Sequence, residues 1–405
     1  MFWRKQLDAL VARLRARNLP LRLVLWNGAS FDLGDDPRVT LTLPAMSGLR
    51  YLLTPSLDNL GTAYVEGDIQ VAGSARDIIA VAAAMADGEI KPEGRFGPIR
   101  RMVRHNRKMD AEAIAYHYDV SNDFYKQWLD DNMVYSCGYF QHPEDSLETA
   151  QVQKIDLILR KIRLQPGQRL LDIGCGWGAL ILRASQHWGA RCVGITLSQQ
   201  QYDLARARIA AAGLEDRCEV RLQDYRDVTG RFDRITSVGM FEHVGLKNLR
   251  AYFARIHELL EDDGVVLNHG ITSTDPDSGE VPWGGGSFIE RYVFPHGELP
   301  HIGLTLREMA AAGLEATDVE NLRRHYARTL EHWSYRFETA GDTLRAMVGD
   351  RRYRIWRIYL AGCAYGFSHG WVALHQIVAT KANSLGAETM PWTRDYIYND
   401  QGAGI

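Results

Sequence analysis

Three glycines separated by single residues make up the part of this sequence best suited to binding a ligand. Residues 172–178 read Asp-Ile-Gly-Cys-Gly-Trp-Gly and directly follow the apolar residues Leu170 and Leu171. The apolar run predicts a buried strand, and the helix-favouring residues 179–184 predict a helix directly after the turn. Glycines at such a junction let a ligand approach the backbone at a helix N-terminus.

The spacing of these glycines differs from two common phosphate-binding patterns. It is neither G-x-G-x-x-G nor a P-loop, because the Lys-Ser/Thr pair is missing. Asp-x-Gly-x-Gly-x-Gly is the pattern of S-adenosylmethionine-dependent methyltransferases, and an acid suits a cationic cofactor better than a pyrophosphate. We therefore predict contacts to S-adenosylmethionine from Asp172, Gly174, Cys175, Gly176 and Gly178. A strand-to-helix turn with incidental glycines is the alternative.

Two further segments follow predicted strands, at the edge where open α/β sheets bind ligands. Residues 196–201 read Thr-Leu-Ser-Gln-Gln-Gln, where most methyltransferases have an acid for the ribose hydroxyls; hydroxyl and amide groups can also hydrogen-bond a diol. In residues 223–226 an acid can accept from the adenine amino group and an aromatic ring can pack on the base, although core packing would also explain the ring. The predicted contacts here are Thr196, Leu197, Gln201, Asp224, Tyr225 and Arg226.

Alternating strand and helix patterns position these segments. Strands are predicted at residues 169–173, 192–195, 219–222, 232–237 and 264–268, with helices at 201–212 and 247–260 and a turn at 262–264. Alternation of this kind is typical of an open parallel sheet. The predicted fold class is therefore α/β, a Rossmann-like class I methyltransferase with a mostly parallel sheet.

The first 95 residues differ in character and predict a smaller α/β domain. Its predicted elements are helices at 2–19 and 75–86 and strands at 21–26 and 39–43. Residues 96–115 are predicted to be a basic linker and residues 116–405 the catalytic domain. Arginine and lysine recur around this junction, at Arg95, Arg100, Arg101, Arg104, Arg107 and Lys108. Such a run is usually a solvated face, but a basic N-terminal helix accompanies it, and the two together favour an anionic bilayer surface.

Composition limits the class of protein further. A net charge of −3 argues against a general nucleic-acid binder. The longest apolar run, residues 78–86, is far shorter than the ~20 residues that a spanning helix needs. Five cysteines, an odd number, and a start without a signal-peptide pattern suggest reduced thiols and the cytoplasm.

Several motifs in order along the chain closely resemble the cyclopropane-fatty-acyl-phospholipid synthases, the family that includes the mycolic acid cyclopropane synthases. The matching segments are residues 117–124, 134–140, 174–178, 194–199, 224–227, 241–245, 292–295 and 363–367. In this family Tyr135, Ser136 and Gln201 would also contact the cofactor. The resemblance is looser over residues 1–95, which look like the family's lipid-binding module.

The resemblance implies methyl transfer from S-adenosylmethionine to a cis double bond of a phospholipid acyl chain. The resulting carbocation would lose a proton from the new methyl group to a bound bicarbonate ion, which closes a cyclopropane ring. Motif matches assign the bicarbonate site to Cys137, Glu242, His269, the backbone of Ile271 and Tyr326, with Cys363 as a further position for which we favour a structural role. Each of these residues also has an ordinary structural explanation.

Other functions remain open at this stage. Relatives form methyl-branched or hydroxylated chains, or methylate a small amine, and a lipid-binding scaffold with an inactive methyltransferase domain is a different class. Retention of the whole bicarbonate site favours ring closure, and the presence of Glu242, Cys137 and the turn glycines argues against an inactive domain. The expected partners are unsaturated phospholipids in anionic membranes, with peripheral association at the inner face, and a homodimer is left open. Phe2, Trp3, Leu7, Leu10 and Leu14 would face the bilayer in an interfacial helix, or pack on their own domain or a partner subunit.

Overall fold

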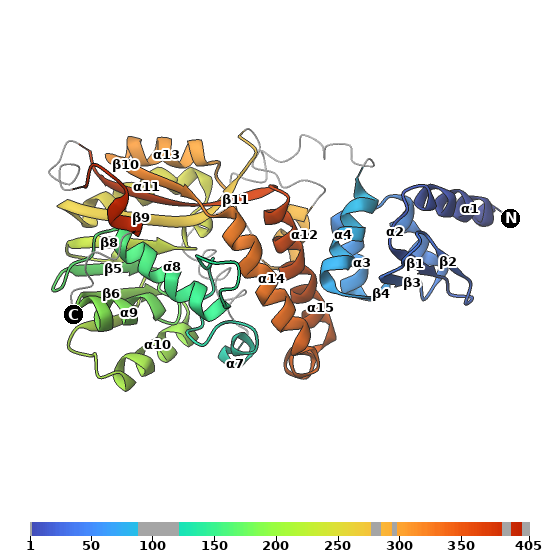
Figure 1. Cartoon of the computed structure of the whole chain (residues 1–405), viewed down its shortest axis with the longest axis horizontal. Helices are drawn as coiled ribbons and strands as arrows, with labels where there is room; N and C mark the ends of the chain where they lie inside the picture. The colour runs from blue at the N-terminus through green and yellow to red at the C-terminus, as the bar shows by residue number, and fades with distance from the viewer. Residues whose placement is uncertain (1, 88–120, 277–284, 294–297, 383–389, 399–405) are drawn as a thin grey trace. The chain divides into compact units, whose positions relative to one another are not determined.

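The protein divides into two compact units in a computed structural model that describes residues 2–87, 121–276, 285–293, 298–382 and 390–398 (Figure 1). Of residues 2–6 and 285 only the backbone is described. The first unit comprises residues 1–103, 280–295 and 330–369, and the second comprises the remaining residues. The division therefore assigns two later segments to the N-terminal unit. The predicted basic linker at 96–115 lies outside the described residues.

The first unit is built on a small four-stranded sheet in the order β2-β1-β3-β4, in which β1 and β3 are parallel. Its strands are β1 (Leu21–Val24), β2 (Ser30–Asp32), β3 (Val39–Thr42) and β4 (Gln70–Ala72). Its N-terminal helices are α1 (Phe2–Arg15), η1 (Met46–Gly48), α2 (Leu49–Leu53), α3 (Leu57–Glu66) and α4 (Ala75–Ala86). Ser56 and Ser74 cap α3 and α4 by accepting hydrogen bonds from the backbone, which fixes where these two helices begin.

The apolar face of α1 packs within the first unit. Leu7, Leu10 and Leu14 are at most 5% exposed, so of the two alternatives for these side chains the structure shows packing on their own domain and not a face open to a bilayer. The interior of their own domain already removes these side chains from water. The side chains of Phe2 and Trp3 are outside the described residues.

Later segments complete the first unit. Helix α12 (Gly285–Tyr292) packs on α3, and α15 (Gly341–Ser368), which is interrupted at Gly349, packs on α3 and α4. Arg357 of α15 links these parts, because its guanidinium donates to Glu338, to the Tyr64 hydroxyl and to the Gly73 carbonyl. Segments distant in sequence thus share one core.

The second unit contains a seven-stranded sheet in the order β10-β11-β9-β8-β5-β6-β7 (Figure 1). The strands are β5 (Arg169–Ile173), β6 (Arg191–Thr196), β7 (Cys218–Leu222), β8 (Phe232–Val238), β9 (Leu260–Ser273), β10 (Leu314–Asn321) and β11 (Val372–Lys381). Strands β9, β8, β5, β6 and β7 are parallel, and β11 and β10 add antiparallel at one edge. The predicted α/β class I fold with a smaller N-terminal α/β domain is confirmed.

Helices cover both faces of this sheet. Apolar side chains of α8 (Leu147–Lys161), α9 (Ala179–Trp188) and α10 (Gln199–Ala211) form a core on one face, and those of α11 (Leu249–Leu259) and α13 (Ile302–Ala311) form a core on the other. The unit also contains α7 (Asn122–Lys126), the first part of α14 (Arg323–Thr339) and α17 (Asp395–Tyr398). Burial on both faces explains why the strands read as nearly continuous apolar runs.

One predicted turn is replaced by a bulge. Residues 262–264 were expected to precede the fifth strand, but β9 already pairs with β8 at Leu260 and resumes the register at Val265. The extra residues bulge out of the pairing, which keeps β9 continuous. Among the described helices, none is long and apolar enough to cross a membrane.

Candidate active site

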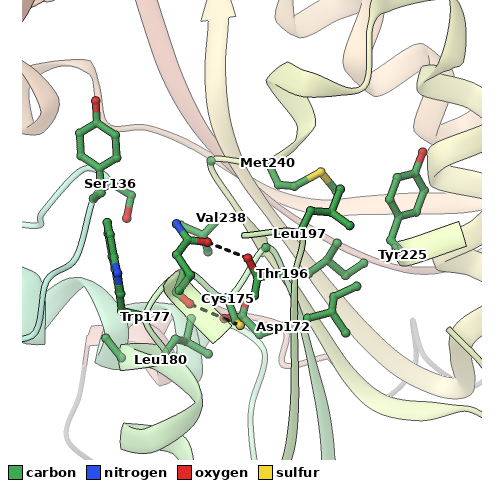
Figure 2. A pocket seen from close by; sticks show the side chains of 18 of the residues that line it. Ser136, Asp172, Cys175, Trp177, Leu180, Thr196, Leu197, Tyr225, Val238 and Met240 are labelled. Carbon is green, nitrogen blue, oxygen red and sulfur yellow. Dashed lines mark hydrogen bonds between the residues drawn. The ribbon is translucent and has the colours of Figure 1, made fainter. Parts of the chain in front are cut away.

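A pocket lies beyond the carboxyl ends of the parallel strands of the second unit, where the sequence predicts the cofactor (Figure 2). It holds about 1180 Å³ of space between atoms, including open solvent at its mouth. All predicted cofactor contacts except Gly178 line it: Tyr135, Ser136, Asp172, Gly174, Cys175, Gly176, Thr196, Leu197, Gln201, Asp224, Tyr225 and Arg226. The folded chain therefore brings segments from four parts of the sequence to one cavity.

The glycine turn between β5 and α9 forms one wall of the pocket. Gly174 and Gly176 have φ angles of 79° and 55°, which side chains rarely allow. A Cβ at Gly176 would meet no atom within 4 Å, so this backbone faces open space. Gly178 does not line the pocket, but it precedes α9 with a φ of 86°. A glycine is needed at position 178 because the backbone turns there into the start of α9.

Thr196 and Gln201 form a hydrogen-bonded pair at the end of β6. The Thr196 hydroxyl donates to Gln201 Oε1 at 2.7 Å; this is the dashed line that ends at Thr196 in Figure 2. Both side chains are buried. Since Oε1 is engaged, the amide nitrogen of Gln201 remains as the donor that a ligand in the pocket can use.

Two buried charged groups, Asp172 and Lys154, line the pocket. Asp172 accepts from the Thr236 hydroxyl at 2.7 Å, and burial raises the pKa of its carboxyl to about 6. Lys154 donates to the Ser136 hydroxyl at 2.7 Å, and burial lowers the pKa of its ammonium to about 8. An ammonium only donates, so the Ser136 hydroxyl must direct its own hydrogen elsewhere. Ser136 can therefore donate to an acceptor group of a ligand.

The aromatic side of the pocket contains Tyr225, which Figure 2 shows across the cavity from Ser136 and Trp177. The Tyr225 ring packs edge-on against Tyr252, with 5.3 Å between ring centres, so it makes the core contact that was the alternative explanation. The same residue lines the pocket, and its contact with the cofactor stays a prediction. Asp224 is held by its neighbour, because Arg226 donates to both oxygens of its carboxylate at 2.8 and 2.6 Å. This fixes the direction of the acid that is predicted to meet the adenine.

A second group of predicted residues meets at the ends of β8 and β9. The Ile271 backbone N–H donates to Glu242 Oε1 at 2.7 Å, while Glu242 Oε2 is buried without a hydrogen-bond partner among the described residues. Burial raises the pKa of this carboxyl to about 7. His269 is 1% exposed, and its Nε2 also lacks a partner in the described part of the chain. Glu242 lies between Met240 and His243, which line the pocket.

For the remaining predicted residues of this group, Cys137, Tyr326 and Cys363, the structure gives burial and position in the chain. The buried Cys137 thiol donates to the Gly138 carbonyl at 3.1 Å, and burial raises its pKa, so the thiol stays protonated. Tyr326 is half-buried in the first turn of α14. Cys363 belongs to α15 in the first unit, whereas the other five residues belong to the second. Burial raises the Cys363 pKa to about 12, which fits the structural role favoured for it.

Some residues that line the pocket were not among the predicted cofactor contacts. Lys154, Trp177 and Met240 line the pocket, and Trp177 Nε1 donates to Asn122 at 2.7 Å. Lys154 lies among the buried residues of α8, a helix that was not predicted from the sequence. In the described part of the chain, no group of histidine, cysteine and acidic side chains could hold a metal ion.

The seven-stranded sheet and the pocket at its carboxyl edge define the class of the protein, an S-adenosylmethionine-dependent methyltransferase. The family described as mycolic acid cyclopropane synthetase matches residues 105–377, and the chain belongs to this family. Residues 10–93 match a separate domain of unknown function.

Similar proteins include a probable fatty acid methyltransferase of Pseudomonas putida, 47% identical over 95% of this chain and 98% of its own length. A cyclopropane-fatty-acyl-phospholipid synthase of Escherichia coli is 38% identical over 67% of this chain and 68% of its own length.

Among solved structures, the cyclopropane synthase MmaA2 from Mycobacterium tuberculosis is 35% identical, with a TM-score of 0.65 over 67% of this chain and 98% of its own. Mycolic acid cyclopropane synthase CmaA1 complexed with SAH and CTAB is 36% identical, with a TM-score of 0.64 over the same shares. A coclaurine N-methyltransferase at 21% identity, covering 80% of this chain and 99% of its own, has a TM-score of 0.63 and shares the fold alone.

Proposed function

We propose that this protein transfers the methyl group of S-adenosylmethionine to a cis double bond in a phospholipid acyl chain and forms a cyclopropane ring. Membership of the mycolic acid cyclopropane synthetase family supports this proposal. The names of two relatives support a lipid substrate, one being a probable fatty acid methyltransferase and the other a cyclopropane-fatty-acyl-phospholipid synthase.

The observation that carries ring closure is that two residues of the predicted bicarbonate site, Glu242 and His269, each have a buried polar atom, Oε2 and Nε2, without a partner among the described residues. Buried polar atoms are nearly always hydrogen-bonded, so two unpartnered atoms in the predicted site favour a small polar ligand there. Bicarbonate fits, since it offers a hydroxyl that can donate to a carboxylate and oxygens that can accept from a ring N–H. The proposed site comprises Cys137, Glu242, His269, Ile271 and Tyr326.

When bound, S-adenosylmethionine supplies the methyl group and bicarbonate supplies the base for the proton that leaves the new methyl. An alkene is a weak nucleophile, so the chain must hold both reactants close together and away from water. The open backbone at Gly176 allows close approach, and the buried Asp172 suits a cationic ligand.

The protonation of the nearby side chains is consistent with this chemistry. A strong side-chain base beside a sulfonium would itself be methylated. Burial raises the pKa of the Cys137 thiol and lowers the pKa of the His269 ring well below its usual value. Both groups are therefore neutral at neutral pH, and the thiolate that would compete for the methyl group is suppressed.

Lipid analysis of a host that expresses the chain tests the proposal. We expect each modified unsaturated acyl chain to gain one methylene and to lose its double bond, with a cyclopropane methylene signal in the proton NMR spectrum. Methyl-branched or hydroxylated acyl chains among the products would contradict ring closure and indicate a related methyl-transfer reaction. Unchanged lipids, together with S-adenosylmethionine binding, would support an amine substrate or an inactive scaffold instead.

We also propose that the substrate is reached at the anionic inner face of the membrane, from the cytoplasm. The basic residues 95–108 and the exposed Arg13 and Arg15 supply positive charge for such a surface. The N-terminal domain is proposed to bind lipid through this charge, not through the apolar face of α1, which is buried.

A further inference from the structure

A row of buried polar side chains crosses the antiparallel edge of the large sheet and ends at His269. Glu320 of β10 lies opposite Gln376 of β11, which in turn lies opposite His269 of β9. Lys161, the last residue of α8, joins the row from one face. Lys161, Gln376 and His269 are each at most 1% exposed.

The contacts along the row fix the direction of each hydrogen bond. Lys161 Nζ donates to Gln376 Oε1 at 2.9 Å, and Gln376 Nε2 lies 3.1 Å from His269 Nδ1. An ammonium has no acceptor, so the oxygen of the Gln376 amide must face Lys161 and its NH₂ group must face the histidine. His269 Nδ1 therefore accepts, and the single proton of the neutral ring is on Nε2.

We propose that Gln376 and Lys161 are positioning residues that hold His269 as the Nε2–H tautomer, so that the ring donates a hydrogen bond to the oxyanion bound beside Glu242. The identity of the oxyanion as bicarbonate rests on the proposed function. The opposite tautomer would present a lone pair to an anion and repel it. The Nε2 atom is buried and has no partner among the described residues, so it is available for this bond.

The charges around the row keep the ring neutral. Burial and the cations of Lys154 and Lys161 lower the pKa of His269 well below its usual value. The positive charge of Lys161 is balanced by ion pairs with Glu320 and, at 3.5 Å, with Asp318. Asp318 also pairs with Arg394 at 2.9 Å. Lys161 thus fixes the orientation of the Gln376 amide and does not itself donate to the His269 ring.

Stability alone is a weak reason for such a row. Buried ion pairs often contribute less to the free energy of folding than apolar side chains of the same size. A chain of hydrogen bonds that all run in one direction, in contrast, needs a group that only donates at one end and a group that accepts at the other. The row supplies both.

Nitrogen-15 NMR of histidine-labelled protein tests the tautomer directly. We expect the His269 signals, identified by their loss in His269→Gln, to show an unprotonated Nδ1 and a protonated Nε2. In Gln376→Glu a carboxylate replaces the donor, so both Lys161 and the ring must donate to it, and Nδ1 should become protonated. The exposed Gln165→Glu adds the same charge and should leave the His269 signals unchanged. A protonated Nδ1 in the unmodified protein would overturn the proposal.

A second variant separates the tautomer from the proposed function. Gln376→Met retains volume and removes the donor, and we expect the bicarbonate concentration for half-maximal turnover to rise about tenfold, as loss of one charge-assisted hydrogen bond implies. S-adenosylmethionine affinity should not change, which shows that the fold is intact. Equal bicarbonate dependence in the unmodified protein and in Gln376→Met would overturn the positioning role. An Nε2–H ring in an enzyme that does not respond to bicarbonate would instead contradict the proposed function and leave the tautomer assignment standing.

Discussion

The carboxyl group of Glu242 has two oxygens in different situations. Oε1 accepts from the Ile271 N–H, and Oε2 is buried without a partner among the described residues. With its pKa raised to about 7, this carboxyl has both protonation states available near neutral pH. Perturbed acids of this kind are typical of functional sites.

Glu242→Gln tests the catalytic importance of this group. We expect turnover to fall by about 10²-fold or more, because the amide cannot hold the proton acceptor in the same way. Affinity for S-adenosylmethionine should remain, since Glu242 does not line the cofactor pocket. Isothermal titration and a turnover assay measure the two quantities, and turnover equal to that of the unmodified protein would contradict the assignment.

The same carboxyl predicts how stability depends on pH. Its folded-state pKa of about 7 exceeds the ordinary glutamate pKa of 4.5, so the folded state binds the proton more tightly than the unfolded state. This contribution is complete below pH ~4.5 and is lost as the pH rises through ~7. The Asp172 carboxyl, with a pKa of about 6, acts in the same direction.

Comparing the pH dependence of stability in the unmodified protein and in Glu242→Gln isolates the contribution of the Glu242 carboxyl. We expect the free energy of unfolding to decline less steeply between pH ~5 and ~7 in the variant. Denaturant titrations at several pH values without ligand measure it. Parallel pH profiles for the two proteins would show that Glu242 keeps an ordinary pKa.

At the scale of elements, the turn between β5 and α9 determines whether the cofactor can approach. Gly176→Val should abolish S-adenosylmethionine binding, because the new side chain would project into the open space of the pocket. Gly213 is a matched control, with a φ of 64° and no atom within 4 Å of an added Cβ, but outside the pocket lining. Both variants should lose roughly 1–2 kcal/mol of stability from the left-handed backbone. Retained cofactor affinity in a folded Gly176→Val protein would refute this role of the turn.

Strand β9 positions Glu242 through a close contact with the residue before it. A Cβ at Gly270 would lie only 2.0 Å from the Phe241 ring, so the ring needs a glycine beneath it. Gly270→Ala should displace Phe241 and with it Glu242, lowering both turnover and stability. Adding Phe241→Leu should recover part of the stability, and denaturation of the single and double variants measures this coupling. Strictly additive losses would show that the two residues do not interact.

The sequence was informative where chemistry and periodicity coincide. The five parallel strands and the glycine turn could be predicted because buried strands and open glycines have distinct local patterns. The antiparallel strands β10 and β11 were missed, since their partners are distant in sequence. Lys161 and Gln376 were missed for the same reason: a buried polar residue is explained only by the neighbour that folding brings to it.

At the scale of the whole molecule, the basic residues around the domain junction predict binding to anionic vesicles. We expect tighter binding to anionic than to zwitterionic vesicles, falling as salt rises, because the Debye length shrinks from ~10 Å at 0.1 M to ~3 Å at 1 M. Replacing Arg95, Arg100, Arg101, Arg104, Arg107 and Lys108 with glutamine should weaken vesicle binding and spare cofactor affinity. Co-sedimentation measures it, and equal binding by the charge-depleted variant would exclude this surface.

The assembly of the first unit from three separated segments has a consequence for synthesis. Helix α4 lies near the beginning of the chain, but α15, which packs on it, is made more than two hundred residues later. A ribosome that adds about 5–20 residues per second leaves that apolar face of α4 uncovered for tens of seconds. The nascent N-terminal segment thus exposes this apolar face throughout the time in which the large sheet is translated.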